Sequence, residues 1–303
     1  MNAQPAAAKH GLAAGLSPTR TDWTIDQGWK NYTAHEHATW KTLFERQTAL
    51  LPQLACREFV EGMRALPLSA DSIPEFAALN EVLKPRTGWQ VVAVPGLVPD
   101  EVFFDHLANR RFPSGNFIRS ADQLDYLQEP DVFHDVFGHV PMLMHPVMAD
   151  FIQLYGEAGL RAQRIGKLTE LARVYWYTVE FGLVKEKVKA EAGVEDALRI
   201  YGAGIASSFT ESVFSVQSPS PHRIGFDLER VMRTNYRIDD FQECYFVLDS
   251  LDDLLALARI DFDPIYERLN SGPNYAPGDL LTTDRVFQCG DGGYVRGQAT
   301  AVG

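Results

Sequence analysis

The chain has 303 residues, of which 46% are hydrophobic and 22% charged, and its formal net charge is −12. This composition is that of an ordinary globular enzyme, and the length suits one large domain or two small ones. The acidic balance argues against a nucleic-acid partner and against an anionic membrane surface, because phosphate binding requires clustered Lys and Arg.

The three cysteines, Cys56, Cys244 and Cys289, form no Cys-x-x-Cys pair. An odd number of widely spaced cysteines argues against a disulfide framework, so we expect a cytoplasmic protein in a reducing compartment. No stretch approaches the roughly 18 apolar residues of a membrane helix. Residues 1–22 lack the continuous apolar core of a signal peptide, and we expect them to form a disordered leader.

Most of the expected elements are helices. Apolar residues at helical spacing predict a helix over 34–66, which Pro52 should kink or split. Later elements are expected as a helix over 72–83, a strand over 90–94, a helix from Pro99, a strand over 112–119, helices over 146–164 and 168–189, a strand over 198–204, and helices over 207–214, 228–232 and 251–259. Beyond Asp261 the composition indicates an irregular tail. The fold class is therefore predicted as mostly α, with a single catalytic domain over 23–260 and a few short peripheral β-strands.

Two histidines, His134 and His139, lie five residues apart in an otherwise apolar stretch. Neutral imidazole is the commonest metal ligand in proteins. On a regular helix the two rings would diverge by roughly 140°. A shared ligand therefore requires a helix widened by an i→i+5 turn, a feature that clusters at functional sites, and Gly138 could permit that distortion. The alternative is a pair of core histidines, each bonded to a backbone carbonyl; two such rings in one apolar run favour a metal.

Glu180 is the best candidate for a third ligand. None of the residues three and four positions away from it is charged, and a carboxylate on such a face needs a partner. That partner is either the metal or Arg173, about two turns back. Two imidazoles and one carboxylate suit the Fe(II) of oxygenases and the zinc of hydrolases. Zinc hydrolases usually space the histidines at i and i+4 with a Glu between them, so the longer interval and Asp135 favour iron.

Other interpretations of these residues stay open. A zinc hydrolase would use the same three ligands to activate water. A non-catalytic, metal-stabilised helical protein would close the site with a fourth protein ligand, for which His145 is the nearest candidate. Arg119, beside apolar neighbours, is a candidate carboxylate clamp because guanidinium binds carboxylates through two parallel hydrogen bonds; otherwise it is an ordinary surface arginine.

Several strings along residues 23–260 form a distinctive set. They are Tyr32-Thr33, Glu36-His37-Ala38-Thr39-Trp40, Thr87-Gly88-Trp89, Phe117-Ile118-Arg119, Glu129-Pro130-Asp131, Phe137-Gly138-His139-Val140-Pro141, Tyr175-Trp176-Tyr177-Thr178-Val179-Glu180-Phe181-Gly182-Leu183, Tyr201-Gly202-Ala203-Gly204, Ser207-Ser208-Phe209, Asn235-Tyr236 and Phe241-Gln242. In these strings the chain resembles the aromatic amino acid hydroxylases, in particular the bacterial phenylalanine hydroxylases.

The resemblance implies a catalytic domain that holds Fe(II) through His134, His139 and Glu180. It implies hydroxylation of L-phenylalanine to L-tyrosine with O₂ and a tetrahydropterin, with hydroxylation of tryptophan or tyrosine as the alternative within the family. Arg119, held by Asp131, would bind the substrate carboxylate. The other implied substrate contacts are Pro130, Trp176, Gly204, Ser207 and Ile238. The implied pterin contacts are Gly96, Leu97, Val98, Phe103, Asp135 and Ala172.

Three positions depart from the family pattern. Animal members carry Glu where this chain has Asp135, which shortens the arm near the pterin. Leu127 stands where the animal enzymes have a substrate-contacting Thr, so that contact is not carried over, and Val98 replaces a Leu. At the position that separates phenylalanine from tyrosine hydroxylases, Ile238 is apolar and favours phenylalanine. Neither the regulatory domain nor the tetramer helix of animal members fits this chain, so we expect an unregulated monomer.

Overall fold

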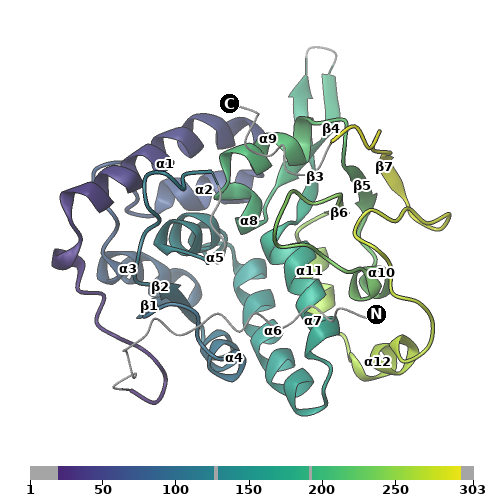
Figure 1. The fold of residues 1–303 in the computed structure, drawn as a ribbon, viewed down its shortest axis with the longest axis horizontal. Coiled ribbons are helices and arrows are strands. Elements are labelled where there is room, and N and C mark those ends of the chain that lie inside the picture. Colours follow the sequence, from purple (N-terminus) through teal and green to yellow (C-terminus); the bar gives the residue numbers. More distant parts are fainter. Residues whose placement is uncertain (1–19, 126–128, 191–192, 295–303) are drawn as a thin grey trace.

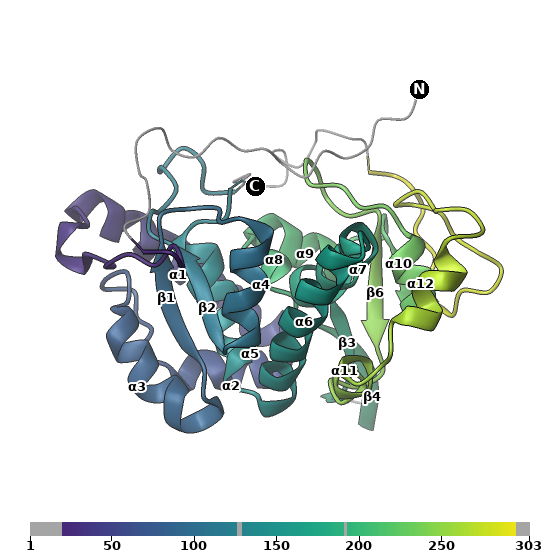
Figure 2. The ribbon, with the colours of Figure 1, turned by 90° about the horizontal axis from the view of Figure 1, so that it is seen from below.

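The computed structural model describes residues 20–125, 129–190 and 193–294. Helices predominate in this part of the chain, as predicted, and the strands form one parallel pair and one five-stranded sheet. The central helices α6 (Pro146–Arg164) and α7 (Leu168–Tyr175) lie between the β1–β2 pair and the larger sheet (Figure 1 and Figure 2). Within these described ranges, no helix is long and apolar enough to cross a bilayer.

The first helices follow a short 3₁₀ turn, η1 (Trp29–Asn31), and cover one side of the domain (Figure 1). The helix expected over 34–66 is two helices, α1 (Ala34–Leu54) and α2 (Arg57–Ala65), and α3 (Phe76–Thr87) follows them. The break lies just after Pro52, where the backbone N–H of Cys56 donates to the carbonyl of Ile200 at 2.9 Å. The predicted split therefore occurs, because the chain bonds to a distant segment instead of continuing the helix.

Strands β1 (Gln90–Val94) and β2 (Arg111–Gly115) pair in parallel, joined by α4 (Asp100–Ala108). The register runs from Gln90 opposite Arg111 to Val94 opposite Gly115. Parallel pairing places the carboxyl ends of both strands at one edge, so the loops that follow them emerge side by side. The strand expected over 112–119 already ends at Gly115. The chain beyond Gly115 can therefore turn toward the predicted metal site.

The helix expected over 168–189 is wrong beyond Glu180. Helix α7 ends at Tyr175, a π-helical turn η3 (Trp176–Glu180) follows, and the chain then forms β3 (Leu183–Ala190). Gly182 marks the change, because a Cβ there would lie 2.2 Å from the ring of Tyr201. The antiparallel strand β4 (Gly193–Ile200) pairs with β3 along its whole length. The strand expected over 198–204 therefore begins at Gly193 and ends at Ile200.

The remaining elements complete the larger sheet, in the order β4-β3-β6-β5-β7. In sequence they are α8 (Ala203–Ala206), α9 (Phe209–Gln217), β5 (His222–Gly225), α10 (Leu228–Arg233), β6 (Cys244–Leu248), α11 (Asp253–Ala258), α12 (Asp263–Leu269) and β7 (Val286–Gln288). The irregular tail expected over 261–303 is therefore regular in part, since β7 pairs antiparallel with β5. Residues 1–19 of the expected leader and 295–303 of the tail lie outside the described residues.

Close packing of α2 on α5 (Val140–Leu143) yields a test of this arrangement. A Cβ added at Gly62 would lie 2.0 Å from the carbonyl oxygen of Pro141, which backbone cannot accommodate without shifting. We expect Gly62→Ala to lower the free energy of unfolding by about 1–3 kcal/mol, measured by urea denaturation. The neighbouring exposed residue supplies the control: Glu61→Ala should change stability by no more than about 0.5 kcal/mol. Equal effects of the two substitutions would contradict the packing.

Candidate metal and substrate site

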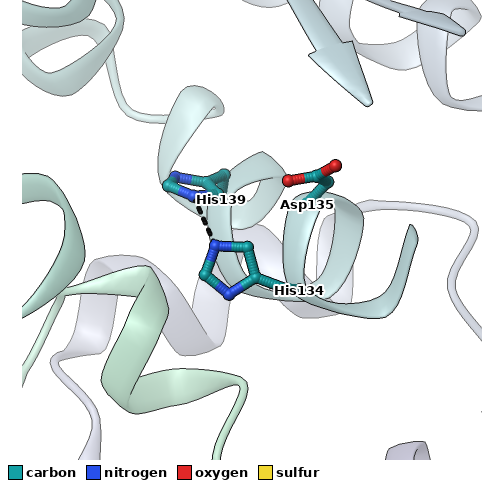
Figure 3. A group of neighbouring side chains, drawn as sticks. All are labelled: His134, Asp135 and His139. Atoms are coloured by element: carbon teal, nitrogen blue, oxygen red, sulfur yellow. Dashed lines mark hydrogen bonds between the residues drawn. The ribbon is translucent and has the colours of Figure 1, made fainter. Parts of the chain in front are cut away.

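The stretch that contains both histidines forms a π-helical turn, η2 (Phe133–His139). The predicted i→i+5 geometry is therefore confirmed, and it turns the two imidazoles toward each other (Figure 3). Their Nε2 atoms lie 3.2 Å apart. Apolar neighbours such as Val136 and Phe137 are fully buried around them, so the rings face each other in a site with little access for water.

Glu180 completes the group from the end of η3, the second π-helical turn. One of its carboxylate oxygens lies 3.3 Å from Nε2 of His139, and the other lies 3.5 Å from Nε2 of His134. Arg173 is turned elsewhere: its guanidinium donates to the carbonyl of Met232 at 2.6 Å and to Oδ1 of Asn235 at 2.6 Å. The alternative ion pair between Arg173 and Glu180 is therefore wrong, and the structure brings the three predicted ligands together.

The protonation states of this group suit a divalent cation. Burial lowers the pKa of His134 to about 4, against the opposing attraction of Glu180, so this imidazole is neutral near pH 7. Burial alone would raise the pKa of Glu180, but His139, His134 and the backbone N–H of Gly204 hold it below its ordinary value. Two imidazole nitrogens and an ionised carboxylate that face one point are a donor set that iron and zinc both accept.

Asp135 and His145 are two other metal-capable side chains in this part of the sequence. A carboxylate oxygen of Asp135 lies within 4.8 Å of the ligand nitrogens of both histidines, although its side chain is set to one side of the pair (Figure 3). Its Oδ2 accepts the backbone N–H of Gly115 at 2.7 Å. Burial raises the pKa of Asp135 well above its ordinary value, and Asp131, Glu180 and Glu129 add to the rise. Among the described residues, the side chains whose ligand atoms all lie within 4.8 Å of one another are His134, Asp135 and His139. His145 is not one of them, and Glu180 is placed by its own contacts with the two imidazoles.

Gly138 and Ser207 bring a third segment to the histidines. A Cβ on Gly138 would lie 2.9 Å from the carbonyl oxygen of Ala203, so glycine permits η2 to approach α8 closely. Beyond α8, Oγ of Ser207 lies 2.9 Å from Nδ1 of His134. That contact fixes the orientation of the imidazole, as partners of the second nitrogen commonly do in metal sites. Ser207, expected as a substrate contact, is thus placed against a predicted ligand, while Gly204 bonds Glu180 through its N–H.

Asp131 joins the predicted carboxylate clamp to the histidines. Its Oδ2 accepts Nε of Arg119 at 2.9 Å, its Oδ1 accepts a terminal nitrogen of the same guanidinium at 2.9 Å, and both groups are buried. The backbone N–H of His134 also donates to Asp131, at 2.9 Å. Another N–H of Arg119 donates to the carbonyl of Leu124 at 3.2 Å. One N–H remains on each terminal nitrogen, a fork that suits a carboxylate.

Trp176, the first residue of η3, belongs to a cluster of aromatic rings. Its indole stacks on Tyr236 with centroids 4.3 Å apart and contacts the ring of Phe181 at 4.6 Å. Pro130 precedes Asp131, and its carbonyl oxygen would be 3.2 Å from a Cβ on Gly115. Ile238 follows Tyr236 on the same loop and is 46% exposed. Gln242, for which no role was expected, accepts the indole N–H through its side-chain oxygen at 2.9 Å.

The predicted pterin contacts come from the loop after β1, from α4, from η2 and from α7. Gly96, Leu97 and Val98 follow β1, and a Cβ on Gly96 would meet the Glu129 carboxylate at 2.9 Å. On α4, Phe103 packs edge-on against Tyr175 with centroids 6.0 Å apart, and Tyr175 in turn stacks on His139 at 6.3 Å. Ala172 lies on α7, three residues before Tyr175. Leu127 lies outside the described residues.

Comparison with known proteins agrees with this geometry. The sequence profile of the biopterin-dependent aromatic amino acid hydroxylases matches residues 27–262. The chain belongs to this family. It is 60% identical over 285 residues to the phenylalanine-4-hydroxylase of Caulobacter vibrioides, covering 94% of each chain.

Solved structures of the Chromobacterium violaceum phenylalanine hydroxylase are similar to this hydroxylase. The structure with iron and phenylalanine bound has a TM-score of 0.82 and 50% identity, and covers 90% of this chain and 96% of that chain. The structure with iron(III) and 7,8-dihydrobiopterin bound also has a TM-score of 0.82, at 52% identity, and covers 89% of this chain and 95% of that chain.

The Arg119–Asp131 pair of the hydroxylase yields a stability prediction. Burial alone would raise the pKa of Asp131, but hydrogen bonds and the charge of Arg119 hold it below its ordinary value. Because the pKa of Asp131 is lower in the folded than in the unfolded protein, the ionised side chain stabilises the fold at pH values above the unfolded pKa near 4. This contribution is lost as the pH falls through the folded-state pKa. Asp131→Asn leaves the buried guanidinium without its counter-ion, which should cost about 3–5 kcal/mol at pH 7.

Urea unfolding as a function of pH measures this effect. The difference between wild type and Asp131→Asn should shrink as the pH falls below about 4. The exposed pair of Arg46 with Asp125, at 2.5 Å, supplies a matched control, and Asp125→Asn should cost less than about 1 kcal/mol. A difference for Asp131→Asn that is small at pH 7, or that stays constant with pH, would contradict the assigned role.

Proposed function

We propose that this chain is a phenylalanine 4-monooxygenase, which converts L-phenylalanine to L-tyrosine with O₂ and a tetrahydropterin at a mononuclear non-haem Fe(II). The observation that carries the proposal is the convergence of His134, His139 and Glu180, with nitrogen–oxygen distances of 3.3 and 3.5 Å. The 60% identity to a phenylalanine-4-hydroxylase supports the same reaction. The chemistry that the metal and the pterin supply when bound is the activation of O₂.

His134, His139 and Glu180 would hold the iron from one side. Their donor atoms come from π-helical turns at two separate places in the chain, η2 and η3. Ser207 on Nδ1 of His134 and Gly204 on Glu180 keep the donors oriented before the metal binds. Preorientation of this kind reduces the rearrangement that binding requires and strengthens metal affinity.

Arg119 would orient the amino acid through the substrate carboxylate. Asp131 and the carbonyl of Leu124 occupy part of the guanidinium and leave one N–H on each terminal nitrogen for a second carboxylate. Because Asp131 also bonds the backbone of His134, the clamp and the metal ligand are held at a fixed separation. Pro130, Trp176 and His134 would line the ring, and the apolar Ile238 suits phenylalanine better than a phenol. Fixed positioning of this kind contributes to rate as well as to specificity.

The pterin would lie between the loop after β1 and the helices α4 and α7. Gly96, Leu97 and Val98 would follow one edge, and Phe103 would stack on the ring system, with Ala172 and Asp135 close by. This placement is supported by the ring contacts from Phe103 to Tyr175 and from Tyr175 to His139, at 6.0 and 6.3 Å, which link this edge to a predicted iron ligand. The carboxyl of Asp135, whose pKa burial raises above its ordinary value, lies on this side and accepts the backbone N–H of Gly115.

We also propose that the enzyme is a cytoplasmic monomer. Its three cysteines are unpaired, Cys56 and Cys244 being buried and Cys289 exposed. Free thiols are usual in a reducing compartment.

Oxygen uptake with phenylalanine tests the proposed reaction. The iron-loaded protein should consume O₂ and form tyrosine in equal amounts only when phenylalanine and a tetrahydropterin are both present. The zinc-loaded protein should be inactive. Activity with zinc in the absence of O₂ and reductant would instead favour a hydrolase.

The metal ligands are tested by comparing two histidines. His139→Ala should abolish both stoichiometric iron binding and tyrosine formation, because it removes one of three ligands. His145→Ala should retain both, since His145 lies outside the cluster of metal-capable side chains among the described residues. Iron content is measured by atomic emission on the purified proteins. One iron per chain in His139→Ala, or loss of iron in His145→Ala, would contradict the assignment.

A further inference from the structure

The side-chain amide of Gln242 joins two segments that flank the proposed substrate site. Its Oε1 accepts the indole N–H of Trp176 at 2.9 Å, and Trp176 is the first residue of η3. Its Nε2 donates to the carbonyl oxygens of Arg237 at 3.0 Å and Asp240 at 3.4 Å. The residue is 3% exposed. Both polar groups of the buried amide are therefore hydrogen-bonded. The oxygen bonds the segment of Trp176, and the NH₂ group bonds the segment of Arg237 and Asp240.

The indole held by this amide is confined on its faces as well. Tyr236 stacks on it with an interplanar angle of 18° and a centroid separation of 4.3 Å. Phe181 contacts it at 4.6 Å. Stacking restricts the tilt of the indole but allows it to slide and turn within its plane. The hydrogen bond to Gln242 is the contact that fixes its rotation in that plane.

The same amide also bonds the loop between α10 and β6, which contacts of Arg237 with Asp239 and of Tyr294 with Asp240 restrain as well. The carbonyls of Arg237 and Asp240 enclose Ile238 and Asp239, so one side chain holds both ends of the segment that carries Ile238. No regular helix or strand spans these residues. In a loop without ladder hydrogen bonds, a buried side-chain amide takes the place of the backbone partner.

Gln242 itself rests on a rigid base. Its backbone N–H points to Oε1 of Glu211 on α9, at 3.4 Å, and the hydroxyl of Tyr245 donates to the same oxygen. Strand β6 begins two residues later, and all of its residues are buried. The amide is therefore supported by the core on one side and reaches toward the proposed substrate site on the other.

We propose that Gln242 is a positioning residue that determines which aromatic amino acid the enzyme accepts, because it fixes Trp176 and the Ile238 loop relative to each other. The inference rests on the proposed function and deepens it. When Trp176 and the Ile238 loop are held in place, the site excludes an amino acid whose ring is larger than that of phenylalanine. A site freed by loss of the amide would admit the larger indole of tryptophan and would bind phenylalanine less tightly.

Substitutions that remove both the acceptor and the donor of the side-chain amide, or the donor alone, test this role. Gln242→Met keeps the length of the side chain and removes every hydrogen bond. Its KM for phenylalanine should rise about tenfold with kcat changed less than about twofold, and the ratio of kcat/KM for tryptophan to that for phenylalanine should rise on the order of tenfold. Gln242→Glu keeps an acceptor for the indole N–H, but its second carboxylate oxygen cannot donate to the carbonyls of Arg237 and Asp240, so it should release the loop and change KM and selectivity in the same direction as Gln242→Met.

A binding measurement gives a readout that does not depend on turnover. Calorimetry of phenylalanine with the iron-loaded enzyme, without pterin, should show the same loss of affinity for Gln242→Met. In a Trp176→Phe background, which lacks the indole donor, Gln242→Met should change the selectivity ratio by less than about twofold, because the link between residue 176 and the Ile238 loop is already broken.

Gln153 supplies a matched control for general loss of stability. Its Oε1 accepts Nε of Arg110 at 2.6 Å and its Nε2 donates to the carbonyl of Ala108 at 3.3 Å, away from Trp176. Gln153→Met should therefore lower the melting temperature without changing selectivity. Should Gln242→Met fail to fold, Gln242→Asn, whose amide is one methylene too short to span both partners, should show the same direction of change.

Unchanged phenylalanine affinity and selectivity in the disruptive Gln242 variant would overturn the proposal, as would additive effects with Trp176→Phe. The proposal would also be overturned if Gln242→Met changed phenylalanine affinity and selectivity only as much as Gln153→Met does. A wild-type enzyme that hydroxylates no aromatic amino acid would refute the proposed function instead, and the calorimetric comparison would still decide the role of Gln242.

Discussion

The i→i+5 turn between His134 and His139 is the constraint on which the site depends. In a regular helix the two imidazoles would point in different directions, whereas η2 brings their Nε2 atoms within 3.2 Å. A widened turn is less stable than a regular one and persists where surrounding packing enforces it. Here buried apolar side chains and the close approach of Gly138 to Ala203 supply that packing. The same device recurs in η3, where it places Glu180 against both rings.

Buried polar side chains then connect this metal site to the substrate side. Asp131 accepts hydrogen bonds from both the Arg119 guanidinium and the backbone N–H of His134, so a displacement of Arg119 would also displace the proposed metal ligand His134. Gln242 plays a comparable part for the aromatic cluster, joining Trp176 to the loop of Ile238. In a low-dielectric interior such contacts are strong when satisfied and costly when one partner is lost. The site is thus held by a few shared hydrogen bonds rather than by many independent ones.

How far the sequence predicted this arrangement depends on the range of the interactions. The π-helical turn was predicted from the spacing of His134 and His139 on the condition that both bind one metal. Glu180 was predicted from an uncharged helical face together with that histidine pair, and both signals are local patterns. Strand β3 was missed because apolar residues continue past η3 to Val184, and the break is imposed by Gly182 against Tyr201, which the pattern does not show. Asn235, which bonds Arg173, and Trp176, which bonds Gln242, each lie roughly 60 or more positions from their partner in the chain, and only folding brings such residues together.

The measurement that tests the central claim most directly is an anomalous difference map of the iron-loaded protein, recorded at the iron absorption edge. The account predicts a single strong peak about 2 Å from Nε2 of His134, from Nε2 of His139 and from a carboxylate oxygen of Glu180. A peak bonded to Asp135 in place of Glu180, or iron bound away from η2 and η3, would contradict it.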